Sequence, residues 1–180
     1  MPQDASNEGT QVTGEPRFEK TISWQDPRPA LAKLPTLAGI DYLRGMMAGE
    51  LPGPPIASLM QMELVEVSEG SATFICTPDD SHFNPIGTVH GGYACTVLDS
   101  ALGCAVQSTL PAGIGYTSIE IKINYLRPIM PSSAPLRAVG TVTQPGNRVA
   151  FADGVLIDAT GKTVATATGS LLVFPIVTQE

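Results

Sequence analysis

The chain has 180 residues and a formal net charge of −7, with 10 Lys and Arg residues against 17 Asp and Glu residues. This length fits one domain with its own hydrophobic core. The negative charge offers no basic surface for a phosphate backbone, so no nucleic-acid partner is expected. No apolar run is long enough to cross a bilayer, the first residues show no secretory pattern, and the three cysteines form no CxxC pair. We therefore expect a cytoplasmic protein without a membrane partner.

The first part of the chain is polar. Residues 1–35 are rich in Gln, Asn, Ser, Glu and Pro and show no sustained apolar period, which predicts a flexible N-terminal tail. Thr36 is a candidate N-cap for a short helix whose apolar face consists of Leu37, Ile40, Leu43 and Met47. We expect one domain of residues 36–176 that includes this helix as an N-terminal docking helix, and we expect residues 51–55 to form a stiff connector.

Six segments then show the apolar period of two that is typical of β-strands. They cover residues 60–67, 71–77, 116–126, 135–143, 148–158 and 163–174. Short turns join the first segment to the second, the fourth to the fifth and the fifth to the sixth. Strands joined in this way must be antiparallel neighbours.

One long helix is expected between these strands, at about residues 89–110. Its apolar stripe consists of Ala94, Val97, Leu98, Ala101, Leu102 and Ala105. Three strands carry alternate small residues that would let another backbone approach closely: Ala138, Gly140, Ala150, Ala152, Gly154, Ala165, Ala167 and Gly169. This pattern fits an α+β fold in which an antiparallel sheet of about six strands wraps one central helix. A generic sandwich with a core of small residues is the alternative.

The segment from His82 to Gly92 joins a strand to the start of this helix. Gly91 and Gly92 fall in the first helical turn, where backbone N–H groups are unpaired and the helix dipole is positive. Such a turn could bind an oxyanion, so both N–H groups are candidate donors to a carbonyl under attack. A glycine-rich helix start chosen for packing would explain the same residues.

Asp99 lies on the same helix, about 120° from the centre of the apolar stripe. The helix has no Lys, Arg or Glu from Gly91 to Leu110. A solvated helix face usually carries long charged side chains, so this face should be covered, most simply by a second subunit. A carboxylate in such a place should be paired or functional. An Asp that forms a hydrogen bond across an interface is the alternative.

Two segments resemble the PaaI-type hotdog-fold acyl-CoA thioesterases, relatives of 4-hydroxybenzoyl-CoA thioesterase: HFNPIGTVHGGYACTVLDSALGCAV at residues 82–106 and GYTSIEIKINYLRPI at 115–129. The most specific part is NPxGxxHGG with an Asp seven residues after the second glycine. The likeness extends over residues 37–174. It implies a hotdog fold, with a sheet wrapped around one long helix. It also implies active sites at the interface of a dimer, and commonly a homotetramer formed from two dimers.

The resemblance further implies roles for individual residues. Asp99 would act as general base or nucleophile. Asn84 would lie near the thioester and the attacking water, which Ser118 would help to hold. The N–H of Gly91 would polarise the carbonyl. His90 would be a structural hydrogen-bonding residue, and with Gly92 it would support the site.

These features favour a thioester hydrolase that converts an aryl- or medium-chain acyl-CoA to free acid and CoA. CoA would be part of the substrate, and no cofactor is expected. With only two histidines and no suitable ligand cluster, no metal site is expected either. Candidate contacts to the CoA phosphates are Arg148, Arg127 and Lys122, which also fit ordinary surface cations. A hotdog module that binds acyl-CoA without turnover is the alternative function, and a hydratase with His90 as base is a third.

Overall fold

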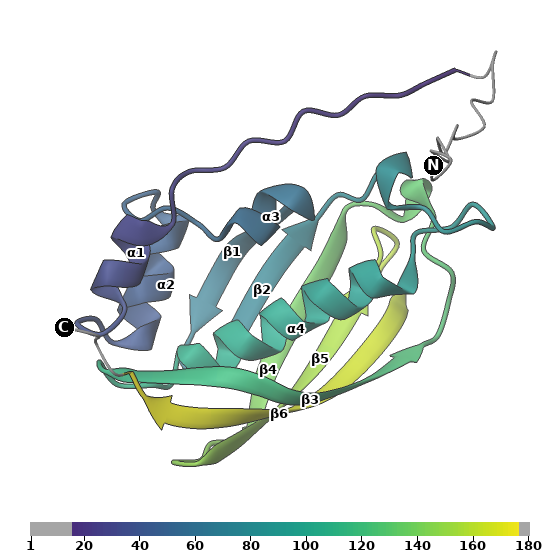
Figure 1. The fold of residues 1–180 in the computed structure, drawn as a ribbon. Helices are drawn as coiled ribbons and strands as arrows, with labels where there is room; N and C mark the ends of the chain where they lie inside the picture. Colours follow the sequence, from purple (N-terminus) through teal and green to yellow (C-terminus); the bar gives the residue numbers. More distant parts are fainter. Residues whose placement is uncertain (1–15, 177–180) are drawn as a thin grey trace, which may run out of the picture.

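The computed structural model describes residues 16–176, and a six-stranded antiparallel sheet forms its largest element (Figure 1). The strands are β1 (Met62–Ser68), β2 (Ser71–Cys76), β3 (Ile114–Tyr125), β4 (Leu136–Gln144), β5 (Val149–Ile157) and β6 (Thr163–Pro175). Their order across the sheet is β1-β2-β4-β5-β6-β3. All six expected strands are present with small shifts of their ends. The predicted hairpin of β1 and β2 and the antiparallel pairs β4–β5 and β5–β6 are confirmed.

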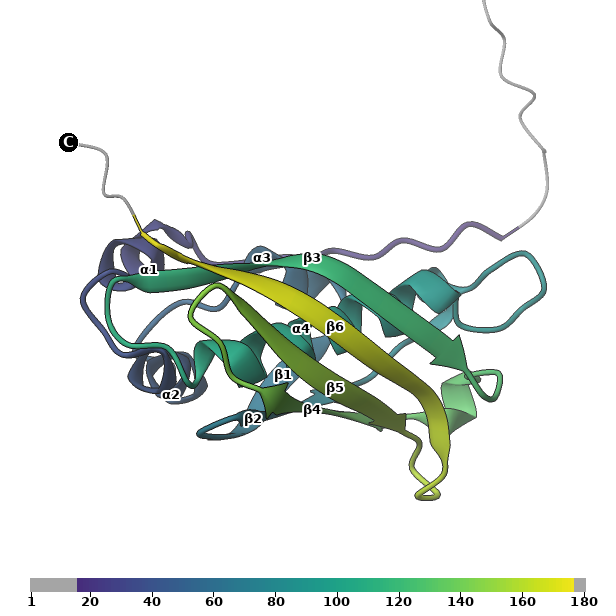
Figure 2. The ribbon, with the colours of Figure 1, turned by 90° about the horizontal axis from the view of Figure 1, so that it is seen from below.

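The long helix α4 (Gly91–Gln107) lies across the concave face of this sheet. Figure 2 shows the strands β4, β5, β6 and β3 crossing beneath it. The predicted stripe is the centre of the core, since Ala94, Val97, Leu98, Ala101 and Ala105 have no exposed surface and Leu102 is 2% exposed. The sequence therefore folds as an α+β hotdog, as predicted.

The glycines among the predicted small residues explain how the sheet comes so close to the helix. A Cβ built on Gly140 would overlap the carbonyl oxygen of Ala101 in α4. On Gly154 a Cβ would lie 2.5 Å from one methyl of Leu102, and on Gly169 it would lie 2.6 Å from the other. These positions therefore need a residue without a side chain.

The N-terminal helices differ from the expectation. Helix α2 (Gly39–Met47) begins three residues after Thr36, follows Ala38 and has no side-chain cap. The Thr36 hydroxyl instead donates a hydrogen bond to the Lys33 carbonyl, 2.9 Å away. The N-cap assignment is wrong because Thr36 belongs to the turn that follows another helix. Helix α2 docks beside the C-terminal end of α4, since a Cβ on Gly39 would overlap the carbonyl oxygen of Gln107, and the Gly39 N–H donates at 2.9 Å to the carbonyl of Leu110, three residues beyond that helix.

Two short helices were not predicted. Helix α1 (Arg28–Lys33) lies within the range expected to be a tail, and its Ala30 is buried. Helix α3 (Pro55–Leu59) begins at the end of the expected connector, with a proline at its first position, where a missing N–H costs nothing. Residues 1–15 of the expected tail lie outside the described residues. No helix within residues 16–176 is long and apolar enough to span a bilayer.

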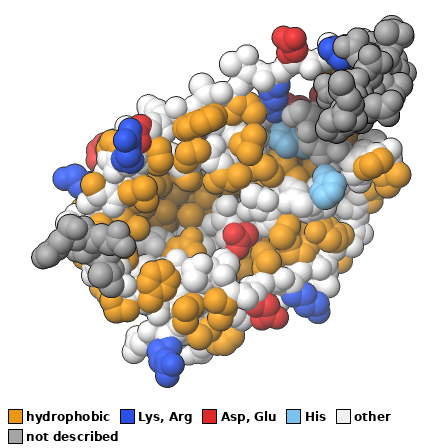
Figure 3. Space-filling view, viewed as in Figure 1, with side chains coloured by type: hydrophobic (Ala, Val, Ile, Leu, Met, Phe, Trp, Pro, Cys, Tyr) orange, Lys and Arg blue, Asp and Glu red, His pale blue; other side chains and the backbone are white. Residues whose placement is uncertain are grey.

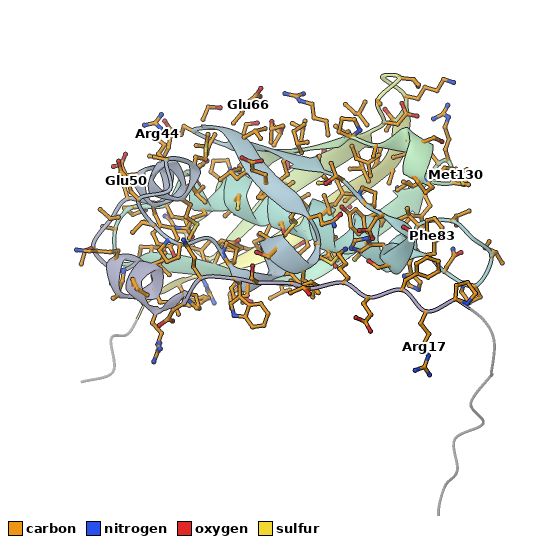
Figure 4. All side chains as sticks on the ribbon, turned by 90° about the horizontal axis from the view of Figure 1, so that it is seen from above. Arg17, Arg44, Glu50, Glu66, Phe83 and Met130 are labelled. Atoms are coloured by element: carbon orange, nitrogen blue, oxygen red, sulfur yellow. The ribbon has the colours of Figure 1, made fainter. Side chains whose placement is uncertain are left out.

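An extended segment, residues 16–27, runs past α3 toward the end of the molecule where Phe83 lies (Figure 4). Lys20 joins this segment to Asp79, with its Nζ 2.8 Å from Asp79 Oδ2. Gln61 and Ser81 donate to the same carboxylate. Desolvation raises the pKa of Asp79, but these hydrogen bonds together outweigh it and hold the pKa well below its usual value. Asp79 thus fixes the start of the loop that leads into α4.

Candidate active site

Asp99 and Ser118 meet in the structure. The Ser118 hydroxyl on β3 donates a hydrogen bond to Oδ1 of Asp99 on α4, with an oxygen-to-oxygen distance of 2.7 Å. Ser118 stands where the pairing of β3 with β6 shifts register, between Ser118 and Glu120. Such an irregularity changes the direction of a side chain and is frequent next to active sites. Nineteen residues separate the two side chains in the sequence, and the fold brings them into direct contact.

A pocket of about 370 Å³ opens at this pair. Its lining comes from α4, β3, the first two strands and the residue before α3: Pro54, Met62, Phe74, Asp99, Ser100, Cys104, Tyr116, Thr117 and Ser118. The face seen in Figure 3 is hollowed, carries many hydrophobic side chains and has few charged ones. A larger hollow of about 750 Å³ lies near the C-terminal end of α4, but Glu69 is the one ionisable side chain in its lining. The smaller pocket, which contains Asp99 and Ser118, is therefore the candidate active site.

The other ionisable groups of the Asp99 pocket are neutral at physiological pH. Burial raises the pKa of the Cys104 thiol to about 12, with a further contribution from the Asp99 charge. Burial also raises the pKa of Tyr116 well above its usual value, with Cys104 and Asp99 adding to the shift. The Tyr116 ring lies where a side chain at Gly103 would stand, so this glycine makes room for it. Asp99 is therefore the one charged group in the pocket lining.

His90 and Gly92 form the cap of α4. The Nδ1 of His90 accepts a hydrogen bond from the Gly92 N–H at 2.8 Å. That N–H is therefore occupied, which argues against Gly92 as a free oxyanion donor. Gly91 donates no hydrogen bond from its N–H within residues 16–176. Its carbonyl accepts one from the Tyr125 hydroxyl at 3.1 Å. One backbone donor is thus available at the start of the helix.

Asn84 uses its side chain within its own loop. Its Oδ1 accepts hydrogen bonds from the N–H groups of Ile86 and Thr88, both at 3.1 Å, and its Nδ2 donates to Thr88 Oγ1 at 2.8 Å. Gly87 completes the turn with a φ of 80°, a conformation that favours glycine. The geometry supports a role for Asn84 in shaping the loop that precedes α4. Contact with a thioester stays a prediction.

The candidate CoA-binding cations do not line the Asp99 pocket. Arg127 donates from its guanidinium to the Thr163 carbonyl, so it helps to close the end of the sheet. Lys122 and Arg148 are exposed, and a phosphate-binding role for them stays a prediction. No group of three or more possible metal-ligating side chains occurs among the described residues.

Several pocket residues were missed by the sequence analysis. Tyr116 could have been found, because it lies two residues before Ser118 on one strand and so faces the same side. Met62, Phe74 and Cys104 could not, because they come from three separate elements and carry no motif. Tyr125, which packs on Gly91, could not have been found either, because no motif in the sequence marks it.

Gly91 and Asp99 are too far apart to act on one carbonyl from the same chain. Eight residues of a rigid helix separate them, which is about 12 Å along the axis at 1.5 Å per residue. A carbonyl that accepts from the Gly91 N–H and a water that attacks its carbon would not bridge this distance. The two groups can serve one substrate only if a second copy of the chain supplies one of them.

A central helix wrapped by an antiparallel sheet, with a carboxylate facing a pocket beside that sheet, defines a hotdog protein with a candidate hydrolytic site. The family model of the thioesterase superfamily matches residues 86–165. A thioesterase assigned provisionally in Ralstonia eutropha, a phenylacetic acid degradation-related protein, is 30% identical, with a TM-score of 0.67 over 73% of this chain and 98% of that one. The chain therefore belongs to the thioesterase superfamily, which confirms the resemblance to the PaaI-type proteins.

Two further similarities agree with this assignment. The PaaI protein of E. coli, from the phenylacetic acid degradation operon, has the same fold, with a TM-score of 0.65, 22% identity, and coverage of 79% of this chain and 97% of that one. A protein of Halobacterium salinarum with a provisional esterase assignment is 35% identical over 96 residues. That alignment covers 49% of this chain and 62% of the relative, so this chain spans less than two thirds of its length.

Proposed function

We propose that this protein is an acyl-CoA thioesterase that hydrolyses an aryl- or medium-chain acyl-CoA to free acid and CoA. The observation that carries the proposal is the Asp99 carboxylate, held by Ser118 at 2.7 Å and standing as the one charged group of an otherwise neutral pocket. A Streptococcus mutans protein of the same fold, with a TM-score of 0.58, 24% identity and coverage of 65% of this chain and 91% of that one, has been crystallised with acetyl-CoA. This supports CoA thioesters as the substrate class.

Asp99 is the general base of the proposed reaction. The Ser118 hydrogen bond occupies Oδ1 and orients the carboxylate, which leaves Oδ2 for a proton of the attacking water. The water oxygen forms a bond to the thioester carbon as Asp99 takes its proton. The C–S bond then breaks, and the CoA thiolate leaves and takes the proton from Asp99. The lone pairs of the Ser118 oxygen can accept the second hydrogen of the water.

The oxyanion of the tetrahedral intermediate binds to the Gly91 N–H of a second copy of the chain. The dipole of α4 adds positive potential at this point, so the charge that develops on attack is stabilised more than the neutral carbonyl. Because Gly91 and Asp99 lie about 12 Å apart within one chain, the complete site requires a homodimer or a dimer of dimers.

The helix face around Asp99 suits such an assembly. The Thr96 hydroxyl donates a hydrogen bond to the Gly92 carbonyl, and the Ser100 hydroxyl donates one to the Thr96 carbonyl, both at 3.0 Å. Their polar groups are therefore satisfied internally and need no water. With no long charged side chain on α4, a second chain can approach this face closely.

A panel assay tests the function. Purified protein is given a series of acyl-CoA esters, and free CoA is measured with a thiol reagent. Asp99→Asn should lower kcat by roughly a hundredfold or more and change KM much less, because it keeps the size of the side chain but cannot take a proton. Asp153→Asn, an exposed Asp on β5, is the matched control and should behave as wild type. Near-normal turnover in Asp99→Asn would reject the mechanism, and no CoA release from any ester would favour a binding module.

A further inference from the structure

A second, apolar pocket lies directly behind the Asp99 pocket. It has a volume of about 200 Å³ and lies between α2 and the first two strands, with Leu43, Met46 and Met47 on one side and Leu64 on the other. The two pockets share four lining residues, which are Pro54, Met62, Phe74 and Cys104. The two pockets are therefore neighbours with a common wall, with a carboxylate on the far side of one and the apolar face of a helix on the far side of the other.

We propose that this inner pocket binds the acyl group, that the acyl group is an unsubstituted aliphatic chain of medium length, and that Met46 sets the length accepted. The inference rests on the proposed function, because it takes the thioester carbon to lie at Asp99. A chain that starts there can enter the inner pocket past Cys104 and Phe74, and its end then meets α2.

The polarity of the wall selects against a substituted acyl group. Glu63 is the one residue with a charged side chain in the inner lining, and it is exposed to solvent. The Cys104 thiol is protonated, since burial raises its pKa to about 12. A ring hydroxyl in the buried part would lose water and meet carbon and sulfur atoms instead. A hydroxyaryl acyl group is therefore a poor occupant, and an alkyl chain is a good one.

The side chains of the wall also suit a flexible chain. Met46, Met47 and Met62 are unbranched and polarizable, so they can repack around chains of different length. Each methylene that leaves water for such a wall should increase binding about fourfold. The increase should stop when the chain reaches α2, because that helix is held in place by the hydrogen bond from Gly39 to the Leu110 carbonyl.

Saturated esters from acetyl-CoA to lauroyl-CoA test this reasoning, together with Met46→Trp and Met46→Ala. Wild type should show a kcat/KM that rises about fourfold per methylene and then levels off. Met46→Trp fills the pocket, so the rise should end at a shorter chain, and kcat/KM for the longest esters should fall by roughly ten- to hundredfold relative to that for acetyl-CoA. In Met46→Ala the rise of kcat/KM should continue to a longer chain than in wild type. Ile40→Ala is the control, because Ile40 is on the same helix but does not line the pocket.

Three results would overturn the inference while leaving the thioesterase function intact. They are a kcat/KM independent of chain length, a preference for hydroxyphenylacetyl-CoA over octanoyl-CoA, and an unchanged profile in both Met46 variants.

If no ester is hydrolysed, the proposed function fails, and calorimetric titration of the same esters tests the pocket by itself. Affinity should still rise with chain length in wild type and stop rising earlier in Met46→Trp. A flat series of affinities would reject the pocket as well.

Discussion

Replacing Gly91 by proline would remove the proposed oxyanion donor and little else. Gly91 is the first residue of α4, a position where proline is favoured because its N–H has no partner within the helix. His90 before it has φ −60° and ψ 138°, a conformation that the residue preceding a proline adopts readily. The helix should therefore form normally in Gly91→Pro.

Gly91→Ala is the matched control. Both substitutions add a Cβ, which would stand 3.1 Å from Cζ of Tyr125. This ring is 57% exposed and can move by the few tenths of an ångström required. Alanine keeps the N–H and proline lacks it, so the difference between the two variants isolates the donor. Loss of one oxyanion donor typically costs about 2.7–4 kcal/mol. We therefore expect kcat of Gly91→Pro to be about a hundred- to a thousandfold below that of Gly91→Ala.

The same variant tests whether the site is shared between chains. Gly91→Pro and Asp99→Asn are co-expressed with different tags, and the species carrying both tags is isolated. If each site takes Gly91 from one chain and Asp99 from the other, this species has one intact site and one site with both lesions. Its turnover should then be about half that of wild type, although each parent is nearly inactive. Turnover no higher than that of the parents would refute the shared site, and equal kcat in Gly91→Pro and Gly91→Ala would refute the donor.

Four further predictions concern the core, the site and the N-terminal region. Gly140→Ala should lower the free energy of unfolding in urea by at least about 1–3 kcal/mol, because its Cβ would overlap the carbonyl oxygen of Ala101. Ser118→Ala should lower kcat by roughly tenfold with little change in KM, since the carboxylate loses a charge-assisted hydrogen bond that orients it. The pKa of Asp79 is lowered in the folded protein, so this residue stabilises the fold above about pH 4. Its contribution is lost as the pH falls through the lowered pKa, and Asp79→Asn should remove that pH dependence from urea midpoints. Deletion of residues 1–15 should leave turnover unchanged.

The main elements of the fold could be predicted because each carries a strong periodic signal. The strands β4, β5 and β6 carry small residues at alternate positions, and α4 carries its apolar residues on one face. These features are properties of neighbouring residues and need no knowledge of distant contacts. Helices α1 and α3 have six and five residues, too few for a helical signal. Such short helices depend on tertiary packing, and Ala30 of α1 is buried.

The candidate site could be predicted only in part, for a related reason. The position of Asp99 on an uncharged helix face was visible in the sequence, and the resemblance pointed to Ser118. The hydrogen bond from Gly92 to His90 was not visible, and neither was the use of the Asn84 amide within its own loop. Both are local bonds that compete with a catalytic role. A motif shows which residues are present, but it does not show which of their donors and acceptors are still free.

The proposed mechanism makes catalysis depend on assembly, and α4 is the reason. One face of this helix packs against the sheet. Its position and length are therefore fixed by the core, in which Gly140 contacts the backbone of Ala101. Its other face carries Asp99, and its first residue carries the Gly91 N–H. A rigid helix cannot bring two groups eight residues apart to one carbonyl. A second copy with its own α4 alongside supplies each missing group to the other chain, so a change that weakens the interface should abolish turnover even where every proposed catalytic residue is intact.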